Sequence, residues 1–242
     1  MLADGFVGLS ITQNLLAVNP GDLRLLVVLP DSTVHDFART SGIPHIVFRS
    51  SIQLVEQIPT DVELGILAWW PKIVPKAVFD IPAQGFINTH PSFLPWNRGK
   101  HYNFWALVEL APFGVSLHRV TENVDAGRVI AQKSIDYDWT DNGESLYQRA
   151  QNEMTSLFLE VWPELRAGKL IEPTDKENSE PVGSVHYAEE LDRASNISLD
   201  SSYLARDLLN LLRARTFPPH PGCWFEDEGE FFQVRIEIER IK

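Results

Sequence analysis

The feature that most constrains the fold is an alternation of short apolar runs with segments of helical period. Helix-like segments cover Leu9–Val18 and Val34–Thr40, and the apolar runs of strand length are Leu23–Leu29, His45–Phe48, Leu64–Ala68 and Gly85–Asn88. Strands that alternate with helices in this way are typical of βαβ units, whose parallel sheet is covered on both faces. The sequence therefore predicts an α/β domain with a Rossmann-like, mostly parallel sheet.

The order of elements changes after this first part. GVSLHRV and VIAQKSI (Gly114–Val120 and Val129–Ile135) predict two strands around the turn TENVDAG, where we expect antiparallel pairing. Gly143–Arg166 predicts one long amphipathic helix that ends at Gly168. We thus expect a main domain over 1–168, a linker rich in Pro, Glu, Ser and Thr over 169–185, and a small α+β unit over 186–242, with a helix at Ser201–Arg215 and a strand at Phe231–Ile241.

The N-terminal stretch DGFVG (Asp4–Gly8) raises two questions. Only Met1–Ala3 precede it, whereas a first strand needs about five residues, so either the strand is short or the true start lies upstream. Its two glycines lack the third glycine and the later acidic residue of a dinucleotide fingerprint. A tight strand-to-helix turn is the favoured interpretation.

Composition excludes several classes of function. The chain has 242 residues with 33 acidic against 21 basic side chains, so no overall basic field is available to hold nucleic acid. Its single cysteine, Cys223, cannot form an internal disulfide. We find no run of about 18 apolar residues and no signal-like N-terminus. The sequence predicts a soluble cytoplasmic protein without a membrane partner.

Residues 86–99, FINTHPSFLPWNRG, concentrate polar groups beside stiff prolines and tryptophans. Asn88 and His90 stand two residues apart at the end of an expected strand, so their side chains project to the same side. An amide donor and a protonated imidazole suit a developing oxyanion, as in acyl transfer. Taken alone, an Asn-x-His at a strand end is more often a satisfied turn.

The spacing of two motifs resembles the folate-dependent formyltransferases. Asn88–Pro95 reads N-x-H-P-S-x-L-P, Arg98-Gly99 follows, and Asp125–Ile130 reads D-x-G-x-x-I, with the similarity extending to about Arg166. The resemblance implies Asn88, His90 and Asp125 as the catalytic set, 10-formyltetrahydrofolate as formyl donor, an amine as acceptor and no metal. Asp125 would keep His90 protonated and accept the proton of the attacking amine. The alternative for Asp125 is an Asx turn before Gly127.

The resemblance also implies where the folate lies. The pterin would insert between two walls and be held largely by backbone groups: Trp69, Trp70, Ile73 and Val74 on one side, Thr121, Glu122, Asn123 and Val124 on the other. The tryptophans could equally be core aromatic residues, because Trp is mostly buried in either case.

The acceptor follows from RGKHYNFWAL (Arg98–Leu107), which is similar to the sugar nucleotide N-formyltransferases. These act on sugars such as a dTDP-4-amino-4,6-dideoxyhexose, for surface polysaccharide (O-antigen) synthesis. The implied substrate-binding residues are Ser92, Arg98, Gly99, Lys100, His101, Tyr102 and Asn103. The alternative is that NFWALVE begins a buried helix in which Phe104 and Trp105 pack.

Other assignments stay open at this stage. Methionyl-tRNA, a purine-pathway ribotide and a lipid A aminoarabinose precursor are alternative acceptors. The tRNA enzymes, however, add a basic C-terminal barrel, whereas the segment after Val185 is short and acidic. A noncatalytic sugar nucleotide binding protein and a hydrolase that delivers formyl to water are alternatives from other classes. The sequence leaves the number of chains open, with a homodimer as one alternative.

Overall fold

The structure is a computed structural model that describes residues 1–169 and 183–241, and it divides into two compact units. The first unit holds Met1–His90, Ser116–Gln132 and the described chain from Gln151 to Lys169. The second holds Pro91–Val115, Lys133–Ala150 and the described chain from Gly183. Residues 170–182 of the expected linker 169–185 lie outside the described chain, and Val185 at its end belongs to a strand, so the expected domain boundaries stay a prediction.

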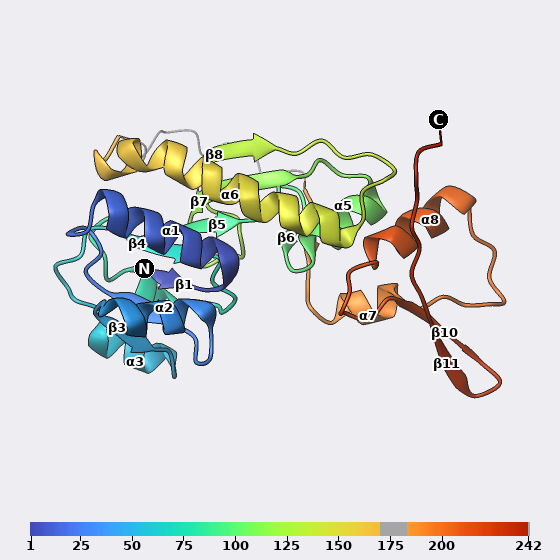
Figure 1. Ribbon diagram of the computed structural model, residues 1–242, viewed down its shortest axis with the longest axis horizontal. Coiled ribbons are helices and arrows are strands. Elements are labelled where there is room, and N and C mark those ends of the chain that lie inside the picture. Colours follow the sequence, from blue (N-terminus) through green and yellow to red (C-terminus); the bar gives the residue numbers. More distant parts are fainter. Residues whose placement is uncertain (170–182, 242) are drawn as a thin grey trace. The chain divides into compact units, whose positions relative to one another are not determined.

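The main sheet has the expected mixture of strand directions (Figure 1). Within the described residues its order is β3-β2-β1-β4-β5-β7-β8. Pairing is parallel from β3 through β5, and β5 and β7 are antiparallel. The strands are β1 (Leu2–Ala3), β2 (Leu26–Val28), β3 (His45–Val47), β4 (Gly65–Ala68), β5 (Phe86–His90), β7 (Gly114–Arg119) and β8 (Val129–Ser134). This confirms the Rossmann-like α/β class and the antiparallel addition.

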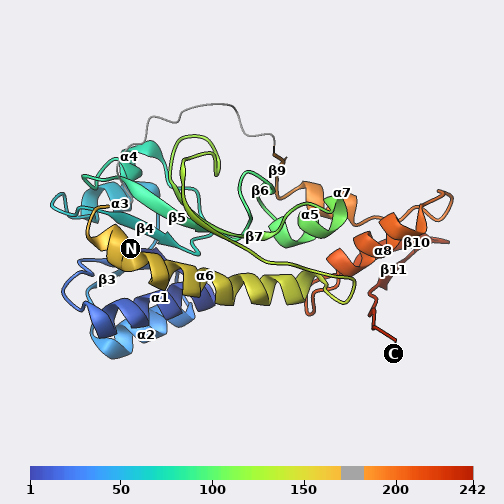
Figure 2. The same cartoon turned by 90° about the horizontal axis from the view of Figure 1, so that it is seen from above.

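Helices cover both faces of the parallel part (Figure 2). α1 (Gly5–Val18) and α2 (Thr33–Ser41) lie on one face, and α3 (Ser51–Gln57) and α4 (Lys76–Phe79) on the other. Serine side chains begin two of these helices, because Ser32 Oγ accepts from His35 N at 3.1 Å and Ser50 Oγ accepts from Gln53 N at 3.2 Å. The sequence did not predict α3 and α4, which are too short to show a helical period.

The start of the chain forms the turn that the sequence favoured. β1 contains two residues, and Leu2 is in register with Val27 on one side and Leu67 on the other. α1 begins at Gly5, whose φ of 59° places it in the left-handed region that favours glycine. The stretch DGFVG is thus a tight strand-to-helix turn.

One apolar cluster lies on the α3 and α4 side of the sheet. Phe86 contributes from β5, and Trp70 and Val74 contribute from the segment after β4. The rings of Phe48 and Trp70 meet edge to face, with centroids 5.4 Å apart. This packing fixes the segment that follows β4.

The long helix α6 (Gly143–Arg166) has the bounds that its pattern predicts. Gly168, just beyond its end, has a φ of 74°, which explains a glycine at the stop. Trp162 Nε1 donates to Asn19 Oδ1 at 3.1 Å, and Arg166 pairs with Asp22. The last turns of α6 are therefore tied to the end of α1.

The second unit contains short elements. These are β6 (Arg98–Gly99), α5 (Tyr102–Glu109), β9 (Val185–His186), α7 (Glu190–Ala194), α8 (Ala205–Ala214), β10 (Cys223–Asp227) and β11 (Glu230–Val234). β6 pairs in parallel with β9, and β10 and β11 form an antiparallel hairpin. The small α+β C-terminal unit is confirmed.

Two C-terminal elements differ from expectation. The expected strand Phe231–Ile241 ends at Val234, because β10 offers partners only for residues 230–234. Ile236 N instead donates to Thr216 Oγ1 at 3.2 Å. The expected helix Ser201–Arg215 begins only at Ala205, where Leu204 has an extended backbone.

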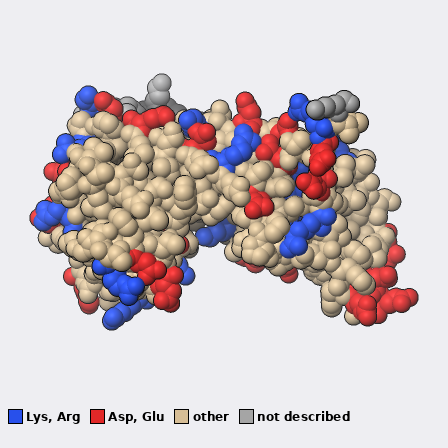
Figure 3. All heavy atoms as spheres, viewed as in Figure 1, with Lys and Arg blue, Asp and Glu red and all other residues tan. Residues whose placement is uncertain are grey.

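Charged side chains of both signs are interspersed on the face seen in Figure 3, and acidic ones gather at the β10–β11 hairpin. Glu226, Asp227, Glu228 and Glu230 are exposed there. Along the described chain, no helix combines the length and the apolar character needed to cross a bilayer.

Candidate active site

Two neighbouring antiparallel strands supply a polar cluster in the first unit. Asn88 and His90 come from the end of β5, and β7 places His118 directly opposite Asn88 and Ser116 opposite His90. His90 and His118 are only 4% and 2% exposed, and Ser116 is fully buried. Because side chains alternate along a strand, this register gathers alternate residues of both strands on one face.

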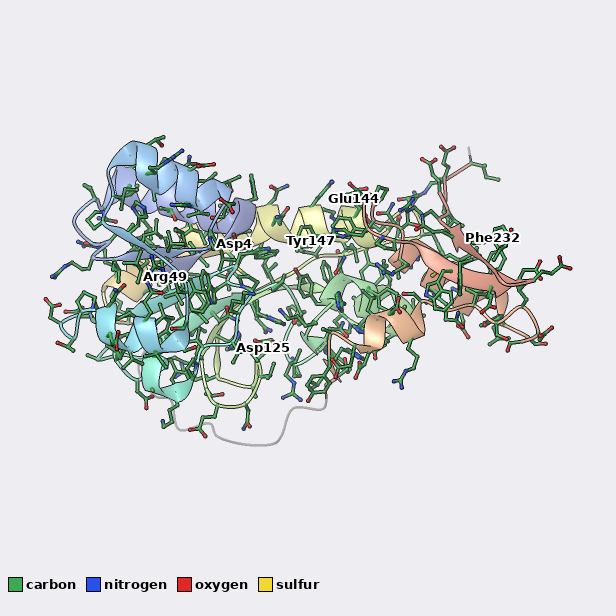
Figure 4. All side chains as sticks on the ribbon, turned by 90° about the horizontal axis from the view of Figure 1, so that it is seen from below. Asp4, Arg49, Asp125, Glu144, Tyr147 and Phe232 are labelled. Carbon is green, nitrogen blue, oxygen red and sulfur yellow. The ribbon has the colours of Figure 1, made fainter. Side chains whose placement is uncertain are left out.

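The third expected residue, Asp125, reaches this cluster from the loop between β7 and β8 (Figure 4). Its φ of 46° is a left-handed conformation that an aspartate adopts at some cost. Gly127 follows closely, and a Cβ there would clash with the backbone oxygen of Arg119. The D-x-G motif therefore allows the loop to pack against the end of β7.

The three expected catalytic side chains lie in contact. His90 Nδ1 is 3.4 Å from Asp125 Oδ2, and Asn88 Nδ2 is 3.4 Å from Asp125 Oδ1. Asp125 keeps 14% of its side chain exposed, so a ligand can reach the carboxylate. An amide donor, an imidazole and a carboxylate thus converge on one place, as proton transfer at a reacting carbonyl requires.

His118 is a member of this cluster that the sequence analysis missed. Its Nε2 lies 3.1 Å from Asn88 Nδ2 and 3.4 Å from Asp125 Oδ1, and its ring meets that of His90 edge to face. The signal was present in GVSLHRV, because strand alternation places His118 on the same face as Ser116. It could not be used without the register between β5 and β7, which a sequence does not contain.

The same side chains have a spacing that metal ions use. Among the described residues, His90, His118 and Asp125 offer ligand atoms within 4.8 Å of one another. Two imidazoles and a carboxylate are a common donor set for zinc or iron. The expectation of a metal-free reaction stays a prediction.

Thr89, between Asn88 and His90, holds the neighbouring strand end. Its hydroxyl accepts from Trp69 N at 2.8 Å and donates to Leu67 O at 3.1 Å. Trp69 has a φ of 59°, which is rare for a bulky residue. The hydroxyl of Thr89 therefore fixes the backbone where the first expected folate wall begins.

The residues of the two expected folate walls have different surroundings. Trp70 and Val74 are core residues, whereas Ile73 is 85% exposed. Thr121, Glu122, Asn123 and Val124 are all exposed in the loop before Asp125. Lys76 Nζ, just beyond the first wall, lies 3.9 Å from Glu122 Oε1. This contact joins Glu122 to the segment just beyond the first wall, and the folate-binding role of both walls stays a prediction.

The expected substrate-binding residues belong to the second unit. Ser92 is buried, Arg98 and Gly99 form β6, and Lys100 is exposed. Asn103, near the start of α5, is buried, and its Nδ2 donates to Gly143 O at 2.7 Å. The amide of Asn103 thus has a structural partner, and the substrate role of these residues stays a prediction.

His101 and Tyr102 lie where α5 begins. Burial lowers the pKa of His101, and the nearby charges of Arg215 and Lys100 lower it further. Burial also raises the pKa of Tyr102 well above its usual value. Both side chains are therefore neutral at pH 7, and the two cations near His101 suit an anionic ligand.

Two family models match the chain. The model described as Formyl transferase matches residues 50–162, which include the whole Asn88, His90, His118 and Asp125 cluster. The model described as N-formyltransferase dimerization C-terminal domain matches residues 190–240.

Curated relatives have related activities. A methionyl-tRNA formyltransferase of Thermodesulfovibrio yellowstonii is 31% identical over 69% of this chain and 52% of its own length. A dTDP-4-amino-4,6-dideoxyglucose formyltransferase of Mycobacterium bovis is 26% identical over 64% of this chain and 65% of its own. The chain thus spans about half to two thirds of the length of these relatives.

Solved structures share the fold. A sugar N-formyltransferase of a Shewanella species has a TM-score of 0.79 at 20% identity, covering 100% of this chain and 97% of that one. The formyltransferase PseJ of Anoxybacillus kamchatkensis, solved with UDP-4,6-dideoxy-4-formamido-L-AltNAc and tetrahydrofolate, has a TM-score of 0.53 at 26% identity over 70% and 88%. Because one formyltransferase model matches residues 50–162 and another matches residues 190–240, the protein belongs to the formyltransferase family.

Proposed function

We propose that the protein transfers a formyl group from 10-formyltetrahydrofolate to the amino group of a nucleotide-linked amino-deoxy sugar, such as a dTDP-4-amino-4,6-dideoxyhexose. The observation that carries this proposal is the contact of Asn88, His90 and Asp125 at the carboxyl end of β5. An amine that attacks a formyl carbonyl creates an oxyanion and a cationic nitrogen. The cluster offers a partner for each.

The steps follow from these groups. The amine nitrogen bonds to the formyl carbon, and the carbonyl oxygen becomes an oxyanion that Asn88 and protonated His90 stabilise. Asp125 accepts a proton from the ammonium, directly or through a water. The bond from carbon to N10 of the folate then breaks, the carbonyl re-forms, and N10 takes a proton.

The amino sugar is favoured as acceptor by two independent observations. The relative from Mycobacterium bovis is named for a dTDP-linked amino sugar, and PseJ was solved with a UDP-linked formamido sugar and tetrahydrofolate. In addition, neutral His101 lies beside Lys100 and Arg215, whose charges suit a diphosphate. The folate donor is supported by PseJ and by the matched family.

A second candidate acceptor is methionyl-tRNA. It is supported by the relative from Thermodesulfovibrio yellowstonii, which is 31% identical. The chain has 33 acidic and only 21 basic residues, which opposes this acceptor because a protein that binds an RNA backbone needs cationic side chains. The exposed acidic side chains of the β10–β11 hairpin oppose it further.

The deciding experiment is a screen of dTDP-, UDP- and GDP-linked amino sugars with 10-formyltetrahydrofolate, which follows the appearance of tetrahydrofolate. Methionyl-tRNA and glycinamide ribotide serve as the competing acceptors. We expect turnover with an amino sugar but not with either competing acceptor, and a chelator should leave the rate unchanged. Turnover only on tRNA or ribotide, or release of formate without an acceptor, would contradict the proposal.

Three further parts of the proposal concern the setting of the enzyme. Residues 190–240 match a dimerization domain, so we expect a homodimer, which light scattering after gel filtration tests. We also expect a cytoplasmic location and a role in surface polysaccharide synthesis. Deletion of the gene should then remove formylated sugar from the polysaccharide.

A further inference from the structure

We propose that His118 is a positioning residue that orients the side-chain amide of Asn88 for its part in formyl transfer. Only the expected effect on catalysis rests on the proposed function. The arrangement itself concerns three side chains of the first unit, Asn88, His118 and Asp125, and it can be measured without a substrate.

His118 has one ring nitrogen committed to the backbone. Its Nδ1 lies 2.8 Å from the carbonyl oxygen of Arg119, so Nδ1 must carry the proton and donate it. In the neutral ring, Nε2 is then a bare acceptor, and its nearer neighbour is Asn88 Nδ2 at 3.1 Å rather than Asp125 Oδ1 at 3.4 Å. Because His118 is only 2% exposed and forms a cross-strand pair with Asn88, this acceptor has a fixed direction.

Asn88 presents its amide nitrogen to that acceptor. Asn88 Nδ2 lies 3.1 Å from His118 Nε2 and 3.4 Å from Asp125 Oδ1, so its two N–H groups serve one partner each. A half-turn of the amide would place its carbonyl oxygen against both acceptors, which is repulsive. The shorter contact, with His118, therefore selects the orientation in which N–H groups face Asp125.

This orientation matters for the chemistry at the formyl group. An oxyanion is stabilised by N–H donors, whereas an amide carbonyl at the same place would repel it. The contact with Asp125 is the longer one, so the N–H that faces Asp125 is the one that can donate to the oxyanion while the other stays with His118. His118 does not take part in the proton transfer to Asp125, so its hold on Asn88 persists through the step.

Two substitutions of similar polarity separate this role from a general structural one. In His118→Gln the amide reaches the position of Nε2 and can still accept from Asn88, whereas in His118→Asn it reaches only the position of Nδ1. We expect His118→Asn to lower kcat about tenfold with both KM values unchanged, since one oriented hydrogen bond is lost. His118→Gln should stay within about threefold of wild type.

Several outcomes would overturn the inference. These are a wild-type kcat in folded His118→Asn, an equal loss of kcat in both variants, and a rise in KM alone. Circular dichroism on both variants establishes that they are folded.

A second measurement needs neither a variant nor a substrate. Two-bond proton–nitrogen NMR spectra of the full chain labelled with nitrogen-15 histidine should show His118 as the Nδ1–H tautomer, with Nε2 as a hydrogen-bonded acceptor. A proton on Nε2, either in the Nε2–H tautomer or in the doubly protonated ring, would refute the orientation argument. If no amino sugar is turned over, the proposed function fails while this spectrum still decides the role of His118.

Discussion

Nδ1 of His90 lies 3.4 Å from Oδ2 of Asp125, although one residue ends a strand and the other lies in the loop between β7 and β8. The contact joins the two motifs that characterise the sequence. A carboxylate beside an imidazole favours the protonated ring, which is the form that stabilises an oxyanion. This pair therefore links charge stabilisation to proton removal.

Replacing His90 should remove turnover without removing folate binding. We expect His90→Asn to lower kcat about 100- to 1000-fold, because one oxyanion stabiliser is lost. Folate affinity, measured by calorimetry, should be unchanged, since the expected pterin walls do not include the imidazole. The exposed His220 gives the control variant His220→Asn, which should keep full activity. Near wild-type turnover in folded His90→Asn would refute the site.

Replacing Asp125 should change the pH profile as well as the rate. Asp125→Asn removes the proton acceptor, so kcat should fall about 100-fold or more. The pH dependence of the rate should also flatten, because no carboxylate remains to hold His90 protonated. Rates measured from pH 5 to 9 test this. A variant that keeps the wild-type profile would show that another group accepts the proton.

The close packing of Gly127 offers a test that leaves the catalytic groups in place. In Gly127→Ala the new Cβ would clash with the oxygen of Arg119, so the loop must shift and carry Asp125 with it. We expect at least a tenfold loss of kcat, because a small displacement of a catalytic group is costly. Gly21→Ala is the matched control, since its Cβ would meet no atom within 4 Å. Equal activities would contradict the importance of the loop position.

Asn103 allows a choice between a substrate contact and a structural bond. Its Nδ2 donates to Gly143 O at 2.7 Å in a buried place. We expect Asn103→Leu to lower the free energy of unfolding by about 1–3 kcal/mol, because the carbonyl loses its partner. Denaturant unfolding measures this. An unchanged stability with a raised KM for the sugar nucleotide would instead support the substrate role.

Cys223 should be inert in the folded protein. Its side chain is fully buried, and burial raises the pKa of the thiol to about 12, so the nucleophilic thiolate is absent at pH 8. A disulfide reagent should react fully only in denaturant.

The sign of the pH effect on stability follows from this raised pKa. The stabilisation is complete below the pKa of the unfolded thiol, near 9, and is lost as pH rises toward about 12. Cys223→Ala should remove this part of the alkaline destabilisation. Rapid labelling of the native thiol would contradict the burial argument.

The sequence predicted the bounds of some elements more accurately than those of others. The long helix Gly143–Arg166 was predicted to the residue, because its period extends over many turns. The helices α3 and α4 were not, because seven and four residues carry little periodicity. The end of β11 was misplaced because the alternation of Phe231–Ile241 continues beyond Val234, the last residue that β10 pairs. Likewise, Trp70 and Val74 could be read as a ligand wall or as core until their packing was known.

The sequence by itself determined the α/β class, the acidic balance and the three residues of the two motifs, because these depend on local patterns and residue types. Only the tertiary structure decided that His118 joins them. Its place depends on the register Asn88↔His118 between antiparallel strands, which is set by long-range pairing and packing. The conformation of the Asp125 loop was likewise decided by the close approach of Gly127 to β7.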